Sequence, residues 1–582
     1  MKYTHHNNEL TMNDINKTVF LKGFVRKKRD LGNLVFVDLR DSEGLTQLAF
    51  DADNPLKAQA EKLKTESVIE VGGHVRERSS KNPNLHTGDI EIDVDTLHVL
   101  SLAKQSPMLI QDDTDALEDT RLKYRYLDLR RPYLQNILKT RHKITATIRD
   151  FLNSQNFYDI ETPYLTRSTP EGARDYVVPS RNYPGNFYAL PQSPQIFKQL
   201  LMVGGFEKYY QIARCFRDED LRADRQPEFT QIDIEMAFVS EDDVMRLSEG
   251  MIKALLKKIK GIELKTPFPR LTYQEALKHY GTDKPDTRFA MKLITLNDIF
   301  KKTDFKVFKT VLDKGGLIKG LPIKNGAKLY SRKNIDQLTK DVAKYGAKGL
   351  AFFKMQDHTL SGPVTKFMSE AELTMFKSIT KLEEGDMMLV VADKASTTNA
   401  ALAYLRNRIA KEQGLIDDNE FDFTWVTDWP MFEYNEEEER YQALHHPFTK
   451  VHDQDKDRIK DAPSDVLAYG YDLVAQGQEL GGGSLRIHEL TMQNDVFTVL
   501  GMDETAIRQQ FGFFVDALQY GTPPHGGIAF GLDRLVMILT GTKNMRDVIA
   551  FPKTASAHCL LSDAPGEVSD EQLKALGLKR RE

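Results

Sequence analysis

The chain has 582 residues, of which 40% are hydrophobic and 28% charged, with a formal net charge of −5 and two cysteines. This length predicts several domains, each with its own core, and the net negative charge excludes a protein that coats nucleic acid without selectivity. Two cysteines exclude a disulfide framework and a multi-thiolate zinc site, and the lack of a signal peptide or an 18-residue apolar stretch predicts a cytoplasmic protein without a membrane segment.

The first hundred residues alternate between apolar and polar positions in short runs. We expect strands at 19–25, 34–39, 46–50, 68–76 and 90–100, with a helix near 56–65. Five short strands interrupted by one helix are typical of an OB-fold β-barrel. We therefore predict that residues 1–105 form such a barrel.

A basic cluster lies at the rim of this expected barrel. Residues 26–29 are all arginine or lysine, and Phe36 lies nearby. An aromatic surface beside positive charge suits single-stranded bases, which need both stacking and phosphate neutralisation. An ordinary barrel with a solvated basic face explains the same residues equally well.

The rest of the chain divides by composition and pattern. Residues 106–135 begin with a polar stretch that lacks periodicity, and we interpret them as a hinge. The next domain is interrupted, because residues 285–415 have the pattern of a separate α/β unit. We expect a divided domain at 136–284 and 416–560, the insertion at 285–415 and a C-terminal tail at 561–582.

Two distant segments carry most of the chemistry. In residues 229–238, Gln231, Asp233 and Glu235 share one parity and apolar residues the other, so a strand here buries one face and lines a polar cavity with the other. The preceding run, 210–217, alternates likewise and ends on Arg217. We expect an acceptor-rich cavity with an arginine at its edge.

The second segment is the glycine-rich run 526–531. Without a Cβ at Gly526, Gly527 or Gly531, a flat ring or a phosphate can lie close to the backbone. Arg534 follows at the start of an expected helix, 533–539, whose N-terminal dipole also favours anions. No P-loop pattern occurs in the chain. Together the segments predict a nucleotide site that is neither a P-loop nor a Rossmann crevice.

These segments resemble the signature motifs of the class II aminoacyl-tRNA synthetases. Residues 216–229 resemble motif 2, residues 526–535 motif 3, and residues 159–163, after an expected helix at 137–155, motif 1. The resemblance extends over nearly the whole chain. Its closest form is the bacterial-type aspartyl enzymes, because residues 285–415 resemble their GAD insertion. It implies a class II α+β catalytic domain with an antiparallel sheet.

The resemblance also implies a reaction and its nucleotide residues. ATP would activate L-aspartate as an aspartyl-adenylate, which is then transferred to tRNA(Asp) with release of AMP and diphosphate. Bringing two anions together requires fixed positive charge, supplied by Arg217 and Arg534 as catalytic residues and by Mg²⁺ on Asp472 and Glu479. The implied ATP contacts are Arg217, Asp218, Glu219, Gln226, Glu479, Gly531, Leu532, Asp533 and Arg534.

A buried substrate carboxylate calls for a two-point partner, and Arg486 follows a glycine-rich run that can approach it. Lys198 adds a second cation, and Asp233 would balance both. The pair His445 and His446 is more often structural or metal-binding, but no third ligand accompanies it in its segment. The implied aspartate contacts are Glu171, Ser193, Gln195, Lys198, Arg217, Asp233, His445 and Arg486.

In the family the barrel reads the anticodon. The matching positions are Arg26, Leu31, Phe36, Gln47 and Glu91. The resemblance implies tRNA(Asp), L-aspartate and ATP as partners, and a homodimer through the motif 1 segment.

Other functions fit the residues less well. A lysine pocket would need acidic groups where Arg486 and Lys198 stand, and an amide substrate does not call for two cations. A synthetase-derived RNA-binding protein without catalysis would lack the motif arginines, which are present here. The alternative that stays open is a relaxed enzyme that also aspartylates tRNA(Asn). Leu31 favours the strict enzyme, because relaxed relatives tend to have His at that position.

Overall fold

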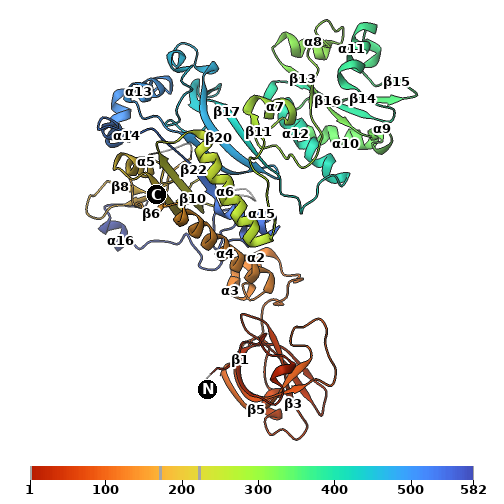
Figure 1. The fold of residues 1–582 in the computed structure, drawn as a ribbon, viewed down its shortest axis with the longest axis vertical. Coiled ribbons are helices and arrows are strands. Elements are labelled where there is room, and N and C mark those ends of the chain that lie inside the picture. Colours follow the sequence, from red (N-terminus) through yellow and green to blue (C-terminus); the bar gives the residue numbers. More distant parts are fainter. Residues whose placement is uncertain (1–2, 170–172, 220–224, 581–582) are drawn as a thin grey trace. The chain divides into compact units, whose positions relative to one another are not determined.

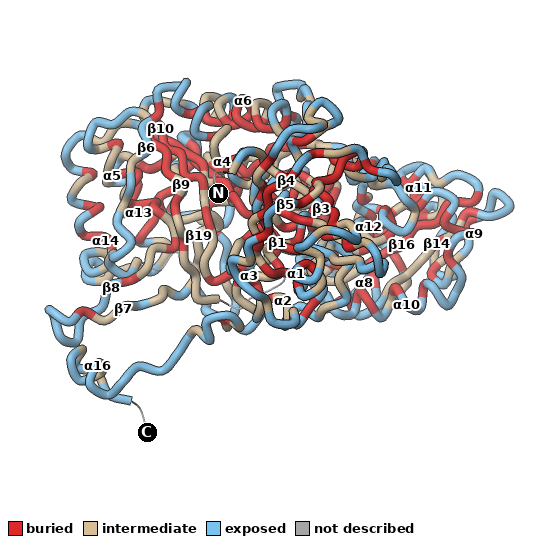
Figure 2. Tube along the Cα trace, turned by 90° about the horizontal axis from the view of Figure 1, so that it is seen from below, coloured by how far each residue is buried: buried red, intermediate tan, exposed pale blue. Residues whose placement is uncertain are grey.

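The computed structural model describes residues 3–169, 173–219 and 225–580. The chain divides into two compact units, Met1–Pro132 and Tyr133–Glu582. Figure 1 shows the elements of each unit, and Figure 2 shows where the buried residues lie along the chain. No helix among the described residues is long and apolar enough to cross a membrane.

The first unit contains a closed β-barrel, which confirms the predicted OB fold. The strand order within the described residues is β1-β2-β3-β5-β4. Buried Val25, Val37, Leu48, Ile69 and Ile92 fill the barrel, as the alternation of each strand predicts. The elements are η1 (Met12–Asp14), β1 (Thr18–Asp30), β2 (Val35–Arg40), β3 (Leu45–Phe50), α1 (Lys57–Glu61), β4 (Val68–Glu77) and β5 (Ile90–Ser101).

Two short helices follow the barrel in the region expected to be a hinge. They are α2 (Glu118–Lys123) and α3 (Arg125–Asp128). Asp128 is fully buried there and accepts hydrogen bonds from Arg125 Nη1 at 2.7 Å and Arg131 Nη1 at 2.8 Å. These charge-assisted contacts fix the end of the unit.

The second unit is built on a mainly antiparallel sheet, as the family resemblance implies. Eight strands of the described residues have the order β11-β17-β20-β21-β22-β10-β9-β6. Only the outermost pairs, β11 with β17 and β6 with β9, are parallel among these described strands. The strands are β6 (Tyr158–Asp159), β9 (Lys208–Phe216), β10 (Glu228–Ala237), β11 (Arg270–Thr272), β17 (Phe423–Pro430), β20 (Leu467–Ala475), β21 (Gln478–Leu485) and β22 (His525–Gly531).

Helices and short ribbons surround this sheet (Figure 1). The motif 1 helix α4 (Pro132–Ser154) begins on a proline, which its first turn tolerates, and buries Ile137, Ile144 and Ile148 on one face. The other elements are β7 (Val177–Pro179), β8 (Phe187–Ala189), α5 (Gln195–Val203), α6 (Glu241–Lys260), α7 (Tyr273–Tyr280), β18 (Phe432–Asn435), β19 (Arg440–Ala443), η3 (Lys456–Arg458), η4 (Pro463–Asp465), α13 (Leu490–Val499), α14 (Glu504–Leu518), α15 (Leu532–Thr540), η5 (Met545–Asp547) and α16 (Asp570–Ala575).

The expected insertion contains a second sheet with helices. Its strand order is β12-β13-β16-β14-β15, and two separate apolar clusters pack against the sheet. The elements are β12 (Ile294–Thr295), α8 (Lys306–Asp313), β13 (Leu317–Ile323), α9 (Gly326–Leu329), α10 (Arg332–Ala343), β14 (Ala351–Gln356), β15 (Thr359–Ser361), η2 (Thr365–Phe367), α11 (Glu370–Thr380), β16 (Met387–Asp393) and α12 (Ala395–Glu412). A unit of strands and helices is therefore present within 285–415, where the sequence pattern predicts the insertion.

Candidate active site

Two adjoining cavities open on the main sheet. The first, about 390 Å³, brings together ten of the predicted residues: Ser193, Gln195, Lys198, Arg217, Glu219, Asp233, His445, Asp472, Glu479 and Arg486. The second, about 230 Å³, is lined by Gln226, Gly531, Asp533 and Arg534. Arg217, Glu219, Glu479 and Lys284 line both cavities. Asp218 and Leu532 line neither, and Glu171 lies outside the described residues.

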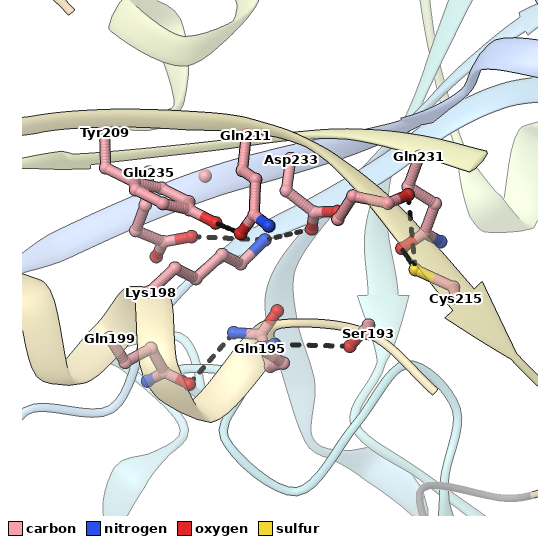
Figure 3. Close-up of polar contacts among 12 residues, drawn as sticks. Ser193, Gln195, Lys198, Gln199, Tyr209, Gln211, Cys215, Gln231, Asp233 and Glu235 are labelled. Carbon is pink, nitrogen blue, oxygen red and sulfur yellow. Dashed lines mark hydrogen bonds and ion pairs between the residues drawn. The ribbon is translucent and has the colours of Figure 1, made fainter. Parts of the chain in front are cut away.

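The floor of the first cavity comes from β10 and α5 (Figure 3). Gln231 and Asp233 line it from alternate positions of β10, as predicted, and Glu235 lies one step further along the same face. Lys198, from α5, places its Nζ 3.1 Å from Asp233 Oδ1 and 3.4 Å from Glu235 Oε2. The side chains of all three are almost fully buried, so this is a charged cluster without bulk solvent.

Glu235 also holds Arg486. Arg486 Nε donates to Glu235 Oε1 at 2.9 Å and Nη2 donates to Oε2 at 3.1 Å. The remaining nitrogen, Nη1, lies 2.6 Å from Ser484 Oγ and 2.7 Å from His446 Nε2. The expectation that Asp233 balances both cations therefore needs correction. Asp233 pairs with Lys198, and the carboxylate that binds Arg486 is Glu235, which alternation places on the polar face of the strand but for which no partner was predicted.

The glycine-rich strand β22 has a different role from the expected one at Gly527. A Cβ there would lie 2.1 Å from both Glu235 Oε2 and the Ile234 carbonyl oxygen, so the missing side chain makes room for a carboxylate and the neighbouring strand and not for a ring or phosphate. At Gly531, by contrast, the nearest neighbour of an added Cβ would be Arg534 Cβ at 3.7 Å. That end of the strand lines the second cavity and leaves space beside the backbone.

Two buried polar atoms of cavity-lining residues have no hydrogen-bond partner among the described residues: Asp233 Oδ2 and Arg217 Nε. Burial raises the pKa of Asp233, and Lys198 opposes that rise only in part. For Glu235, burial also favours the neutral acid, but Arg486 and Lys198 outweigh it and lower the pKa. Buried polar atoms are normally paired. An unpartnered acceptor and an unpartnered donor at the cavity wall therefore favour a polar, charged ligand.

Asp472, in β20, and Glu479, in β21, form an acidic pair. A Cβ on Gly482 would lie 2.7 Å from Asp472 Oδ1 and 3.4 Å from Glu479 Oε1, so the glycine leaves a cradle facing both carboxylates. Burial and the neighbouring Glu479 raise the pKa of Asp472 well above its usual range. Two oxygen ligands fit a magnesium ion that takes its other ligands from phosphates and water. No cluster of three such side chains occurs in the described part of the chain.

The histidine pair adjoins the acidic pair. His445 Nε2 lies 3.8 Å from Asp472 Oδ1, and its ring packs edge-on against Trp429 at 4.7 Å between centroids. Burial lowers the pKa of His445 to about 4, and burial with the nearby Arg486 lowers the pKa of His446 well below its usual value. Both imidazoles are therefore neutral near pH 7.

The two motif arginines are held by different neighbours. The Arg217 guanidinium stacks over Phe229, 4.9 Å from the ring centroid, and Arg534 Nη1 donates to the Glu479 carbonyl oxygen. Glu219 pairs with Arg225 at 2.9 Å. This arrangement puts fixed positive charge on both cavities.

Other residues that were predicted to contact the nucleotide interact with the protein itself. Asp533 is buried, accepting from Arg141 Nη1 at 2.6 Å and from the Thr230 amide at 3.0 Å. Gln226 exchanges two hydrogen bonds with the Lys553 backbone. Asp218 lies with a carboxylate oxygen 3.9 Å from Arg174 Nε. Asp533 and Gln226 thus anchor the walls of the second cavity, a role that spacing in the sequence does not reveal.

Three of the five predicted anticodon residues, Phe36, Gln47 and Glu91, belong to one network in the barrel. Gln47 Nε2 donates to Glu91 Oε2 at 2.7 Å, and Gln47 Oε1 accepts from Arg29 and Arg78, each at 2.7 Å. Phe36 pairs with Arg29 across β1 and β2, with the guanidinium 5.5 Å from its ring centroid. Leu31 and Arg26 are exposed. Arg29 and Arg78 therefore join Phe36, Gln47 and Glu91 as candidates for a base-binding surface.

Two protein-family descriptions match the sequence. "tRNA synthetases class II (D, K and N)" matches residues 117–555, and "OB-fold nucleic acid binding domain" matches residues 19–100. The first covers well over half of the chain, and the second coincides with the closed barrel.

Curated relatives match along their whole length. An aspartate--tRNA ligase from Macrococcus caseolyticus is 54% identical over 574 residues, covering 98% of this chain and 97% of that protein. An aspartate--tRNA(Asp/Asn) ligase from Anoxybacillus flavithermus is 55% identical over 580 residues, covering 99% and 98%. Among solved structures, an asparaginyl-tRNA synthetase from Pyrococcus horikoshii complexed with asparaginyl-adenylate has a TM-score of 0.60 at 19% identity, covering 95% of this chain and 99% of that one. That likeness shows a shared fold.

Proposed function

The chain belongs to the class II tRNA synthetases of the D, K and N group, and from this premise we propose that it attaches L-aspartate to tRNA(Asp). ATP is the co-substrate, aspartyl-adenylate is the intermediate, and AMP and diphosphate are the products. The curated relatives named for aspartate support this choice within the group.

The observation that carries the choice of aspartate is the first cavity. Lys198 and Arg486 both line it, and Asp233 presents a buried carboxylate oxygen without a partner among the described residues. A substrate with a side-chain carboxylate gains two cations, and its α-ammonium gains an acceptor. The lysine side chain would meet two like charges, and the asparagine side chain would offer no charge to them. The cavity therefore favours aspartate over both.

The proposed first step joins the two cavities. An oxygen of the aspartate α-carboxylate attacks the α-phosphorus of ATP, a new O–P bond forms, and the bond to the β-phosphate breaks to release diphosphate. Arg217 lines both cavities, so it can neutralise the carboxylate and the α-phosphate together, while Arg534 serves the diphosphate end. This step requires alignment and charge, with no nucleophilic side chain.

Magnesium belongs to the proposal as a further positive charge on the phosphates. Asp472 and Glu479 would hold it, since both present carboxylates to the cradle at Gly482. In the second step, the 3′-hydroxyl of the terminal tRNA adenosine attacks the activated carbonyl carbon and AMP leaves.

We also propose a homodimer and a strict tRNA preference. Near the motif 1 segment, Tyr158, Tyr164, Leu165 and Phe206 expose 61%, 41%, 54% and 42% of their surface, which suits a protein interface. Leu31 favours tRNA(Asp) alone. The alternative, charging of tRNA(Asn) as well, is supported by the name of the Anoxybacillus flavithermus relative. Side-by-side aminoacylation of the two purified tRNAs distinguishes these proposals.

A further inference from the structure

Lys284 is a cation of the active-site region that none of the signature motifs contains. It lies in the connection between α7 and β12, where the catalytic domain leads into the insertion. Its side chain lines both the first and the second cavity. Lys284 therefore lies where the two cavities adjoin, which is where the proposed reaction would take place.

The contacts of Lys284 define its position in this structure. Its Nζ lies 3.0 Å from Glu479 Oε2 and 3.8 Å from Asp283 Oδ2, and 40% of the side chain is exposed. The segment that carries it is held in place by contacts of nearby side chains. The Lys284 amide donates to Thr282 Oγ1 at 3.1 Å, and Asp286 forms a two-point ion pair with Arg288 at 2.7 and 3.0 Å. The backbone of Lys284 is thus held in place, while its ammonium is carried by a flexible four-carbon side chain.

The neighbouring charges determine which anion the Lys284 ammonium would bind when magnesium and ATP occupy the site. Glu479 is its nearest acid, and Glu479 is also one of the two proposed magnesium ligands. A divalent cation on Glu479 would compete for that carboxylate and repel the lysine. The anions then available to a partly exposed lysine are the phosphate oxygens of ATP, to which lysine binds as a compact, rotatable donor.

We propose that Lys284 binds the diphosphate portion of ATP: it pairs with Glu479 in this structure and would donate to a β- or γ-phosphate oxygen when ATP occupies the second cavity. This inference rests on the proposed function and adds a positioning residue for the leaving group. Arg217 and Lys284 line both cavities, and Arg225 and Arg534 line the second, so Lys284 would add a cation to the arginines that face the nucleotide.

A purely structural role is the alternative. Lys284 could simply neutralise Glu479 and so shape the cavity. In that case its loss would affect every nucleotide in the second cavity to the same extent. A phosphate contact instead affects ATP, which has β- and γ-phosphates, and spares AMP, which lacks both.

The test is equilibrium binding of ATP and of AMP, each with magnesium and without aspartate, measured by isothermal titration calorimetry. The variants are Lys284→Met, Lys284→Arg to retain the charge, and Lys292→Met as a matched control at an exposed lysine further along the same connection. We expect Lys284→Met to weaken ATP binding by about tenfold to hundredfold, the range of one charged hydrogen bond. AMP binding should stay within about twofold, and Lys284→Arg should recover most of the ATP affinity.

The remaining outcomes overturn the inference in distinguishable ways. Equal loss of ATP and AMP affinity in Lys284→Met would show a structural role. Unchanged affinity for both would show that Lys284 does not contact the nucleotide. If the parent protein binds neither nucleotide, the proposed function fails together with the inference. Thermal unfolding of each variant, with and without aspartate, verifies that the first cavity is intact.

Discussion

Arg486 and Glu235 form a two-point ion pair between residues that are 251 positions apart in the sequence, with Nε–Oε1 and Nη2–Oε2 distances of 2.9 and 3.1 Å. The third guanidinium nitrogen, Nη1 of Arg486, contacts Ser484 Oγ and His446 Nε2. Lys198 Nζ lies 3.4 Å from Oε2 of the same carboxylate. Glu235 therefore orients both cations that the proposed function assigns to the substrate carboxylate.

Arg486→Leu should abolish aspartate-dependent exchange between diphosphate and ATP. The change takes the guanidinium from both the substrate carboxylate and Glu235, which then have, among the described residues, only Lys198 as a cationic partner, and breaking a buried pair costs about 3 to 5 kcal/mol. We expect exchange to fall by at least about a hundredfold and the protein to be less stable. A variant that keeps exchange within about twofold of the parent would show that the specificity arginine is misassigned.

The control for this experiment separates binding from stability. Adding Glu235→Gln to Arg486→Leu removes the carboxylate charge that has lost Arg486, so the thermal midpoint should recover in part. Exchange should stay lost, because the substrate still has no guanidinium partner. Recovery of both properties together would mean that Arg486 acts only through the fold.

Phe36→Ala should separate the two halves of the reaction. The change removes an aromatic platform that is worth about 1 to 3 kcal/mol for each stacked base. Charging of tRNA(Asp) should therefore weaken by about tenfold to hundredfold, while exchange, which needs no tRNA, stays unchanged. Leu100→Ala, an exposed apolar residue at the end of β5, is the matched control. A parallel loss of both activities would instead make the barrel a structural support.

His445 should make the second unit sensitive to acid. Burial lowers its pKa to about 4, from an ordinary value near 6.5. Between these values the unfolded chain binds more protons than the folded one. The contribution of neutral His445 to the free energy of unfolding is therefore complete above pH 6.5 and is lost progressively as pH falls from 6.5 to 4. Between pH 7 and pH 5, we expect His445→Asn to remove about 2 kcal/mol of the pH-dependent loss in the free energy of unfolding.

Tryptophan fluorescence during urea unfolding is a direct readout for this prediction. Both tryptophans of the chain, Trp425 and Trp429, lie in β17, and Trp429 contacts the His445 ring. The exposed imidazole of His358 provides the comparison, as His358→Asn. An identical pH dependence in parent and His445→Asn would refute the assignment of this acid sensitivity to His445.

The homodimer can be tested by sedimentation. The exposed Tyr158 and Phe206 rings contact each other edge-on at 6.2 Å and lie in the apolar cluster near motif 1. The parent should sediment as a dimer at micromolar concentration, and Tyr158→Glu with Phe206→Glu should shift it toward monomer because two charges would enter the interface. A fully active parent monomer would overturn the proposal.

Local periodicity explains why much of the fold could be predicted. The strand expected at 68–76 is Val68–Glu77, and the helix expected at 533–539 is Leu532–Thr540. In both, the pattern of apolar side chains reports which face is buried. The helix expected at 56–65 is shorter, Lys57–Glu61, because its ends turn into the barrel loops and its N-terminus has no side-chain cap.

The partners of the site residues could not be predicted in the same way. Alternation places Glu235 on the polar face of its strand but gives no information about a guanidinium 251 residues away. Gly527 suggests open space, whereas the Glu235 carboxylate occupies it. Lys284 lies in an irregular connection without periodicity. These assignments depend on strand pairing and loop packing, which a local pattern does not encode.

Aminoacylation with purified tRNA(Asp) tests the central proposal most directly. The protein is incubated with ATP, magnesium and labelled aspartate, asparagine or lysine, and the acid-precipitable tRNA is counted, with tRNA(Asn) in a parallel reaction. We predict ATP-dependent aspartylation of tRNA(Asp), little transfer of asparagine or lysine, and little aspartylation of tRNA(Asn). Charging with asparagine or lysine in preference to aspartate, or no charging of tRNA(Asp) by folded protein, would contradict the account.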